Sequence, residues 1–303
     1  MKNAINYYYN LKAESIHQQD NKYKFTTNLK QYLLCKYDGK IEELEEKYYL
    51  QQYLNIKQIY CHRIIKNKYN QLITKINLKK YVLIELIFNN RIINLKDISL
   101  LSNINVDKNS FKYINKDEWK DLWKRKIDYI EYQINQLGKK YNIIIESNDY
   151  FIGIVENCIE LIENEKIKSN NCTICHERIE EKTNTDDFYN PVNFIIDDKT
   201  RDIAEYIKKT LYKEQCNNKN LINYIMINNL YRNEILLLFA RIMYPSIYFD
   251  SYEQILAKKI EEKELLKIIN NLHNFENNII SLYNELKQIT DMPNIEWLVF
   301  KEY

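Results

Sequence analysis

The first ninety residues have the alternating apolar and polar pattern that is typical of half-buried β-strands. Residues 23–27 alternate aromatic or threonine side chains with lysine and threonine, and the apolar run 31–37 (QYLLCKY) stops at an Asp-Gly turn dipeptide. A second apolar run, 81–88 (YVLIELIF), stops at Asn-Asn. We predict strands in these three segments and a further pair of strands at 61–66 and 71–76.

A helix is predicted between these strands. The segment 41–54 (IEELEEKYYLQQYL) is rich in strong helix formers, and Ile41, Leu44 and Tyr48 share one face of a helix with 3.6 residues per turn. The predicted order in this part of the chain is therefore two strands, the helix and then the remaining strands.

After the last of these strands, the apolar residues recur at steps of three and four. The pattern runs from Trp119 to Leu137 and is followed by Gly138, a residue type that often caps helix C-termini. We predict one long helix there and further helices at 150–162, 203–211 and 265–286.

Alternation in the first part of the chain and three- and four-residue steps in the second predict an α+β chain with two parts. A small β-rich lobe occupies 1–89 and a larger helical lobe occupies 90–303, with no internal repeat or low-complexity linker between them. With 303 residues, 45% of them hydrophobic, the chain is long enough to bury a sizeable core.

Charge and composition exclude several classes of function. The chain has 44 Lys and Arg against 42 Asp and Glu, a net charge of +2 that gives no general field for nucleic acid. Its three glycines stand apart, so it has no glycine-rich phosphate loop. No run approaches the roughly 20 apolar residues of a membrane span, and residues 1–15 lack the apolar core of a secretory signal. We expect a soluble protein made in the cytosol.

The segment 172–176 (CTICH) has the spacing used for covalent haem attachment, and its cysteines are also half of a possible zinc site. Haem attachment occurs outside the cytosol, however, and a structural zinc site needs four ligands. Cys61, His62 and Cys216 supply no second pair at standard spacing. We therefore expect free thiols in a reducing compartment and no bound metal.

Lys36 lies within a predicted apolar strand, where an ammonium group is costly unless a carboxylate or phosphate meets it. One interpretation is a phosphate-binding lysine, with which a glutamate of the following helix (42, 43, 45 or 46) pairs. The other is a lysine that faces water on an edge strand, since alternation puts Leu34 and Lys36 on one face and Cys35 and Tyr37 on the other.

The stretch 193–204 (NFIIDDKTRDIA) carries the densest candidate chemistry. An apolar strand ends in the adjacent carboxylates Asp197 and Asp198, and Arg201 and Asp202 open an amphipathic helix. Carboxylates at the end of a buried strand suit a magnesium-nucleotide site, because hard cations prefer oxygen ligands. The simpler alternative is that Asp198 ends the strand at a turn and Asp202 stabilises the helix start.

This order of parts resembles the kinase-like fold, and four segments narrow the resemblance: 148–162, 173–178 (TICHER), 191–208 and 238–252 (LFARIMYPSIYFDSY). They are similar to the aminoglycoside-phosphotransferase-like branch and, within it, to the CotS and YutH family of bacterial spore coat proteins. The resemblance implies a bilobal protein-kinase-like fold with a small antiparallel-sheet N-lobe and a larger, mostly helical C-lobe.

The resemblance also implies that the catalytic loop is altered. Active phosphotransferases of this branch use His-Gly-Asp, in which the Asp acts as general base, followed five residues on by a metal-binding Asn. Here His176 is followed by Glu177 and Arg178, and a guanidinium cannot accept a proton. Thr183 stands at the position of the Asn.

Other positions keep the residue types of the branch. By resemblance, Lys36 would anchor phosphate and Asp197 would bind metal, as remnants of an ATP and magnesium site. Asp202, next to Arg201, would be a structural carboxylate that bonds back to the His176 loop.

We therefore expect a catalytically degenerate kinase-like protein, made in the mother-cell cytoplasm and deposited in the spore coat. Its partners would be other coat proteins, and it would need no cofactor beyond weakly bound ATP and Mg²⁺. The alternative is a working ATP-dependent phosphotransferase on a small molecule or coat protein, in which Glu177 or Asp186 replaces the missing base.

Overall fold

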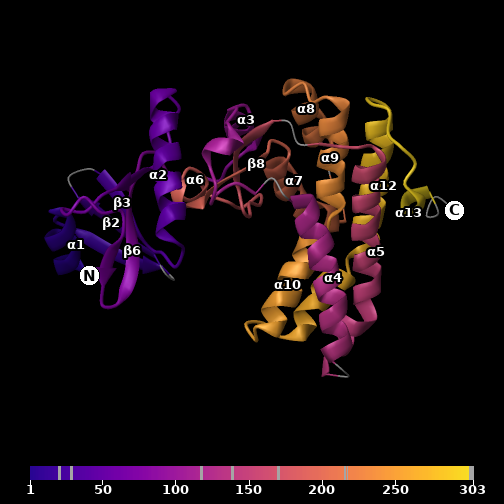
Figure 1. Cartoon of the computed structure of the whole chain (residues 1–303), viewed down its shortest axis with the longest axis horizontal. Coiled ribbons are helices and arrows are strands. Elements are labelled where there is room, and N and C mark those ends of the chain that lie inside the picture. The colour runs from indigo at the N-terminus through magenta and orange to yellow at the C-terminus, as the bar shows by residue number, and fades with distance from the viewer. Residues whose placement is uncertain are drawn as a thin grey trace.

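The structure is a computed structural model that describes residues 1–19, 22–27, 30–116, 119–137, 140–168, 171–214, 216 and 218–299. A sheet lobe and a helical lobe lie side by side (Figure 1). Gly138, the predicted helix cap, lies outside the described residues. No helix in the described part of the chain combines the length and the apolar character of a membrane span.

The N-lobe is one antiparallel sheet with the strand order β1-β2-β3-β6-β4, and β5 pairs with β6 outside this path. The predicted strands and the predicted helix are confirmed, while α1 and β1 were not foreseen. The elements are α1 (Lys2–Tyr9), β1 (Ser15–Gln19), β2 (Lys22–Thr27), β3 (Lys30–Lys36), α2 (Ile41–Ile56), β4 (Arg63–Ile65), β5 (Thr74–Ile76) and β6 (Lys79–Leu86).

A helix covers each face of this sheet. Leu33 and Cys35 of β3 belong to the core cluster that contains Leu44 of α2. Leu34, between them, packs in a separate cluster with Ile5 of α1. The alternation of side chains along β3 therefore separates a face toward α2 from a face toward α1.

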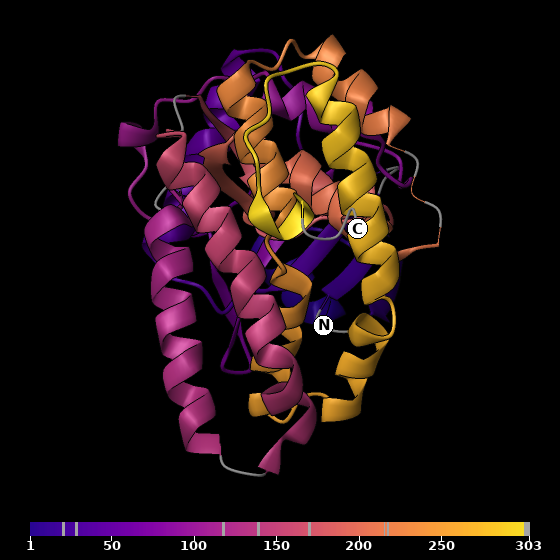
Figure 2. The same cartoon turned by 90° about the vertical axis from the view of Figure 1, so that its right-hand side faces the viewer.

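The C-lobe begins after β6, and its first helix starts at Leu95, so the predicted boundary near Asn89 lies in the connecting segment. Its long helices lie in front of the sheet lobe in Figure 2. The elements are α3 (Leu95–Ser102), α4 (Trp119–Leu137), α5 (Asn142–Asn164), β7 (Cys172–His176), α6 (Thr185–Phe188), β8 (Phe194–Asp198), α7 (Arg201–Lys208), α8 (Lys219–Ile227), α9 (Arg232–Met243), α10 (Ser246–Leu256), α11 (Leu266–Ile269), α12 (Leu272–Lys287) and α13 (Glu296–Val299), with 3-10 turns at Lys108–Ser110, Pro191–Asn193, Lys209–Tyr212 and Glu262–Leu265.

The helix predicted as continuous over 265–286 is interrupted. It begins as the short helix α11, and the chain then turns before α12 starts. The side-chain amide of Asn271 donates to the carbonyl of Lys267, and the Asn271 N–H bonds back only three residues, to Ile268. Asparagine competes for backbone groups in this way and favours turns over helix interiors.

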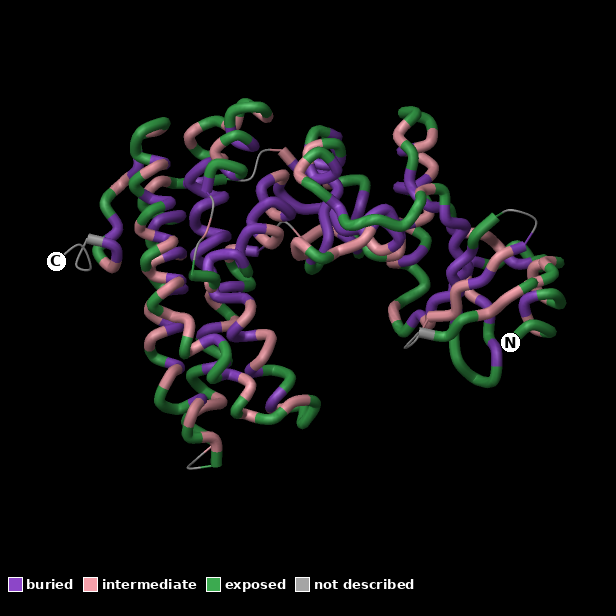
Figure 3. The backbone as a smooth tube through the Cα atoms, turned by 180° about the vertical axis from the view of Figure 1, so that it is seen from behind, coloured by how far each residue is buried: buried purple, intermediate pink, exposed green. Residues whose placement is uncertain are grey.

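One core joins the two lobes. The largest cluster of buried side chains fills the C-lobe and also includes Leu50, Leu54 and Cys61 from α2 and the segment after it. Figure 3 shows buried chain running through the middle of the molecule, between the two lobes. The second half of α2 thus packs with the C-lobe, while its first half packs with the sheet.

A buried histidine links the lobes. His62 is fully buried, its Nδ1 accepts the N–H of Ile87 (2.9 Å), and its Nε2 lies 3.0 Å from the carbonyl of Thr185 in the C-lobe. Burial lowers the pKa of His62 below its ordinary value of 6.5. Protonation at Nδ1 would also remove the acceptor for Ile87.

We predict that stability falls as the pH drops from 7 toward 5. The unfolded chain takes up a proton near pH 6.5 that folded His62 resists, so stability declines below that pH, by at most about 1.4 kcal/mol per pH unit for one proton. Urea unfolding across this range should show a flatter pH dependence for His62→Gln. The exposed His273→Gln serves as control, and an unchanged slope in His62→Gln would contradict the assignment.

Candidate functional site

The strands β7 and β8 form an antiparallel pair that sets the candidate site. The pairing places His176 opposite Phe194 and Thr173 opposite Asp197. The His176 loop follows β7 directly, and α7 begins three residues after β8. Segments that the sequence singled out separately therefore meet at one place.

Asp197 is fully buried, and both of its carboxylate oxygens are bound by arginines. Oδ2 accepts from Nη1 of Arg201 at 2.5 Å, and Oδ1 accepts from Nη2 of Arg241 at 2.6 Å. Oδ1 also accepts the backbone N–H of Asp198. Burial alone would lower the pKa of Arg201, but the Asp197 and Glu205 carboxylates outweigh it, so that pKa is raised.

This arrangement does not fit a magnesium site. A bound Mg²⁺ would lie beside the two guanidinium groups that bind the oxygens of Asp197, and their positive charges would repel it. Within the described residues, no group of three or more His, Cys, Asp and Glu side chains is arranged to hold a metal ion. The Asp198 carboxylate accepts from the N–H and hydroxyl of Thr200, so it closes the turn before α7.

Asp202 bonds back to the His176 loop, as the resemblance implied. Its Oδ1 accepts the backbone N–H of His176 at 2.9 Å, and its Oδ2 lies 2.6 Å from Nδ1 of the same residue. The other ring nitrogen of His176 lies 2.8 Å from the carbonyl of Phe188. Nε of Arg201 donates to the carbonyl of His176, so Arg201 and Asp202 both fix this loop.

Arg178, at the general-base position of the resemblance, is held by a carboxylate of another helix. Its Nε and Nη2 donate to the two oxygens of Asp250 on α10, both at 2.7 Å. This two-point bond raises the pKa of the Arg178 guanidinium above its usual value. A permanently protonated side chain therefore occupies the position that should accept a proton.

The other loop residues show no catalytic pairing among the described residues. Glu177 is exposed and makes no ion pair there. The Thr183 hydroxyl accepts the N–H of Glu180 and closes a turn. Asp186, the other candidate replacement base, pairs with Lys24 of β2 at 2.5 Å, while its Oδ1 is buried without a partner.

Lys36 lies on the sheet face opposite to α2. It shares this face with Leu34, and its ammonium pairs with Asp38 at 2.7 Å. The pairing with a glutamate of the following helix that the sequence left open is therefore wrong. The Lys36 side chain is 30% exposed, but the alternative of an edge-strand lysine is wrong as well, because β3 lies between β2 and β6 in the sheet.

Two other lysines reach the cavity of about 620 Å³ between the lobes. Lys22 of β2 pairs with Asp187, and Lys47 of α2 pairs with Glu43 and donates to the carbonyl of Val192. Sequence reasoning missed both. The spacing of four residues between Glu43 and Lys47 was the available signal, whereas Lys22 and Asp187 lie far apart in sequence.

The motif Cys172-x-x-Cys175-His176 lies on β7, and all five of its residues are buried. Residues three apart on a strand point to opposite faces, so the two sulfur atoms do not converge on one metal. Burial raises the pKa of the Cys175 thiol well above its usual value. The described geometry of this segment is that of a core strand.

Comparison with known proteins now identifies the family. The family described as "Spore coat putative kinase YutH" matches residues 2–288. The chain belongs to this YutH family. No curated protein matches it at a significant level.

Solved structures of kinase-like enzymes share the fold of this YutH family member. An aminoglycoside phosphotransferase from Alicyclobacillus acidocaldarius matches with a TM-score of 0.68 and 9% identity, over 95% of this chain and 96% of that chain. Spectinomycin phosphotransferase APH(9)-Ia matches with a TM-score of 0.60 and 12% identity, over 91% of this chain and 92% of that chain. Choline kinase LicA from Streptococcus pneumoniae matches with a TM-score of 0.54 and 9% identity, over 91% of this chain and 97% of that chain. These likenesses confirm the bilobal kinase-like fold.

Asp202→Ala should lower the free energy of unfolding by roughly 1 to 3 kcal/mol, because it removes a buried acceptor from the His176 loop. Asp202→Asn keeps one oxygen acceptor and should cost less. Asp121, an exposed carboxylate in the first turn of α4, provides the matched control. Urea unfolding that shows equal losses for Asp202→Ala and Asp121→Ala would contradict a specific role of the loop contact.

Proposed function

We propose that this protein is a catalytically degenerate kinase-like component of the spore coat that acts through contacts with other proteins. The observation that carries this proposal is the occupation of Asp197 by Arg201 and Arg241. A carboxylate that is neutralised by two guanidinium groups attracts a metal-nucleotide complex far less than a free one does.

The loop supports the same proposal. General-base catalysis needs an acceptor within hydrogen-bond reach of the reacting hydroxyl. Arg178 supplies donors only, and its bond to Asp250 also occupies the carboxylate of that residue. At the other side of the cavity between the lobes, Lys22 is engaged by Asp187.

The alternative, an active ATP-dependent phosphotransferase, rests on Glu177 and Asp186. Glu177 is exposed and lines both the cavity between the lobes and a second cavity in the C-lobe. Asp186 has one oxygen without a partner but is held by Lys24. Glu177 is therefore the better candidate for a replacement base, and its replacement is the variant that separates the two proposals.

The coat role rests on the family, whose description places its members in the spore coat. We infer synthesis in the mother-cell cytoplasm and deposition in the coat, with other coat proteins as partners. We propose no required cofactor, and ATP with Mg²⁺ only at low affinity.

Purified protein should neither hydrolyse ATP nor transfer its phosphate, and Mg-ATP should not raise its melting temperature measurably. Calorimetric titration and a phosphate-release assay test this, with Asp197→Asn, Lys36→Ala and Glu177→Gln as comparisons. A rise of several degrees in the melting temperature with Mg-ATP, abolished in both Asp197→Asn and Lys36→Ala, would contradict the prediction that nucleotide does not bind measurably. Turnover that requires Asp197 or Glu177 would establish the phosphotransferase instead.

In sporulating cells, Lys36→Ala should enter the coat normally, because the ion pair that Lys36 makes among the described residues is with the neighbouring, exposed Asp38. Asp202→Ala should be depleted from spores, since it loosens the centre of the C-lobe. Tagged variants in fractionated spores provide the measurement. A normally folded Lys36→Ala protein that fails to reach the coat would argue against a contact-based role, as would a wild-type protein found only in vegetative cells.

A further inference from the structure

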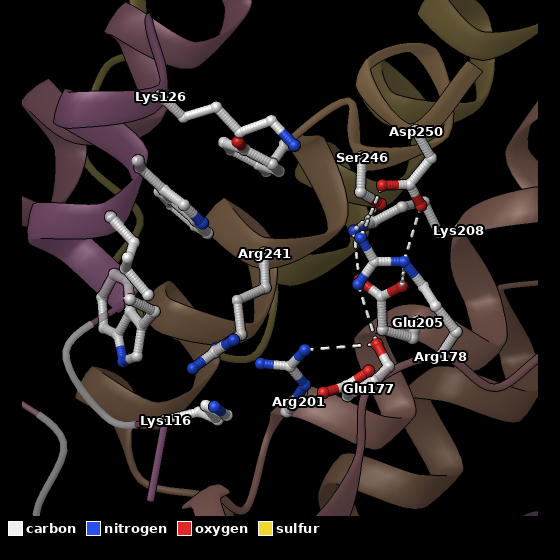
Figure 4. Close-up of a pocket in the computed structure, with 14 residues that line it drawn as sticks. Lys116, Lys126, Glu177, Arg178, Arg201, Glu205, Lys208, Arg241, Ser246 and Asp250 are labelled. Carbon is white, nitrogen blue, oxygen red and sulfur yellow. Dashed lines mark hydrogen bonds and ion pairs between the residues drawn. The ribbon is translucent and has the colours of Figure 1, made fainter. Parts of the chain in front are cut away.

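A second cavity, of about 440 Å³, lies within the C-lobe, next to the arginines that bind Asp197. Its wall comes from the start of α4, from α7, from the end of α9 and from α10. Figure 4 shows Lys116, Arg201 and Arg241 directed toward one another at one end of it, with Arg178 and Asp250 on another side. This cavity is distinct from the one between the lobes.

One part of the wall is aromatic. The rings of Trp123 and Tyr244 are stacked, with centroids 4.3 Å apart and an angle of 15° between their planes. Trp119 packs beside Trp123, with centroids 5.0 Å apart. Flat, apolar surfaces of this kind bind flat, apolar groups.

Most cations of the cavity have carboxylate partners. Arg178 is bound by Asp250, Lys208 by Glu205, and Lys126 by Glu253 outside the cavity. Arg201 uses three of its five N–H donors, which bind Asp197 and the carbonyls of His176 and Glu177.

Three donors at the cavity remain without such partners among the described residues. Lys116 makes no ion pair there, and its backbone N–H bonds to the carbonyl of Ile196, which fixes it beside β8. Nε of Arg241 and Nε1 of Trp119 have no acceptor, and they are shielded from water because each residue is only 5% exposed. The guanidinium of Arg241 lies 4.8 Å from the centre of the Trp119 ring, so these two donors are neighbours.

From this geometry we propose that the C-lobe cavity binds a small organic oxyanion, a phosphate monoester or carboxylate carried on a flat apolar group. The oxyanion meets Lys116, Arg241 and Trp119, and the apolar group packs against Trp123 and Tyr244. Buried donors that lack acceptors are costly, and an anion supplies several acceptor oxygens at once.

The charges favour an anion over a cation. Six cationic side chains line the cavity, and five carboxylates line it or pair with those six. Four of the five carboxylates are already bound by lysine or arginine, so a cationic ligand finds only exposed Glu177. The cations are Lys116, Lys126, Arg178, Arg201, Lys208 and Arg241, and the carboxylates are Glu177, Asp197, Glu205, Asp250 and Glu253.

The proposal does not depend on whether the protein transfers phosphate, because the cavity and its donors lie in the C-lobe and need no nucleotide. Glu177 borders the cavity, and its negative charge repels an anion there. The replacement of Glu177 by a neutral residue should therefore strengthen binding.

Calorimetric titration of the full chain in low salt tests the proposal with three probes that share one ring: phenyl phosphate, benzoate and phenyltrimethylammonium. We expect phenyl phosphate or benzoate to bind with one-to-one stoichiometry, and the cationic probe not to bind. Inorganic phosphate should bind more weakly than phenyl phosphate, since it lacks the ring. Tryptophan fluorescence should change in step with binding, because Trp119 and Trp123 line the cavity.

Lys116→Met should weaken binding of the anionic probe at least tenfold, and Glu177→Gln should strengthen it. Lys120→Met is the matched control, because Lys120 lies four residues after Lys116, in the first turn of α4, but pairs with Glu163 outside the cavity. Melting curves establish that each variant is folded. The proposal is wrong if neither anionic probe binds, if the cationic probe binds equally well, or if Lys116→Met and Lys120→Met have the same effect.

Discussion

The C-lobe depends on one buried carboxylate, Asp197, and the two arginines that neutralise it. A charge without solvent exposure is tolerated only if it is paired and fully hydrogen-bonded, and removal of one partner of such a group typically costs about 3 to 5 kcal/mol. Arg201 comes from the start of α7 and Arg241 from the end of α9, so this contact joins β8 to both helices. Arg201 also holds the carbonyls of the His176 loop, and the loop thereby shares the same support.

The residues around this centre hold the His176 loop in place. His176 and Asp202 keep the geometry that positions a catalytic loop, with every polar atom of the contact used. The position where the base belongs carries Arg178, which is tied to α10 by Asp250. The loop is thus held in place, while Arg178 stands at the base position of the resemblance and arginines bind both oxygens of Asp197. These contacts are the physical basis for the proposed loss of catalysis.

Local pattern was sufficient to predict much of this from the sequence. Alternating apolar and polar residues predicted the strands, and apolar residues at steps of three and four predicted the long helices. The same alternation predicted that Lys36 and Leu34 share one face of their strand. Alternation does not say which face looks toward the rest of the protein, and for that reason the role of Lys36 stayed open. Arg241 was not foreseen as a partner of Asp197, because 44 residues separate them and only tertiary packing brings them together.

The two arginines also change what the region can bind. A metal-nucleotide site presents carboxylate oxygens to a cation, whereas here guanidinium groups cover the carboxylate and turn their remaining surface toward the C-lobe cavity. Arg241 contributes to both effects, since its Nη2 neutralises Asp197 while its Nε has no acceptor among the described residues. The side chain that neutralises Asp197 therefore also leaves a donor at the cavity. The proposed loss of metal binding and the proposed preference for an anion therefore rest on the same side chain, Arg241.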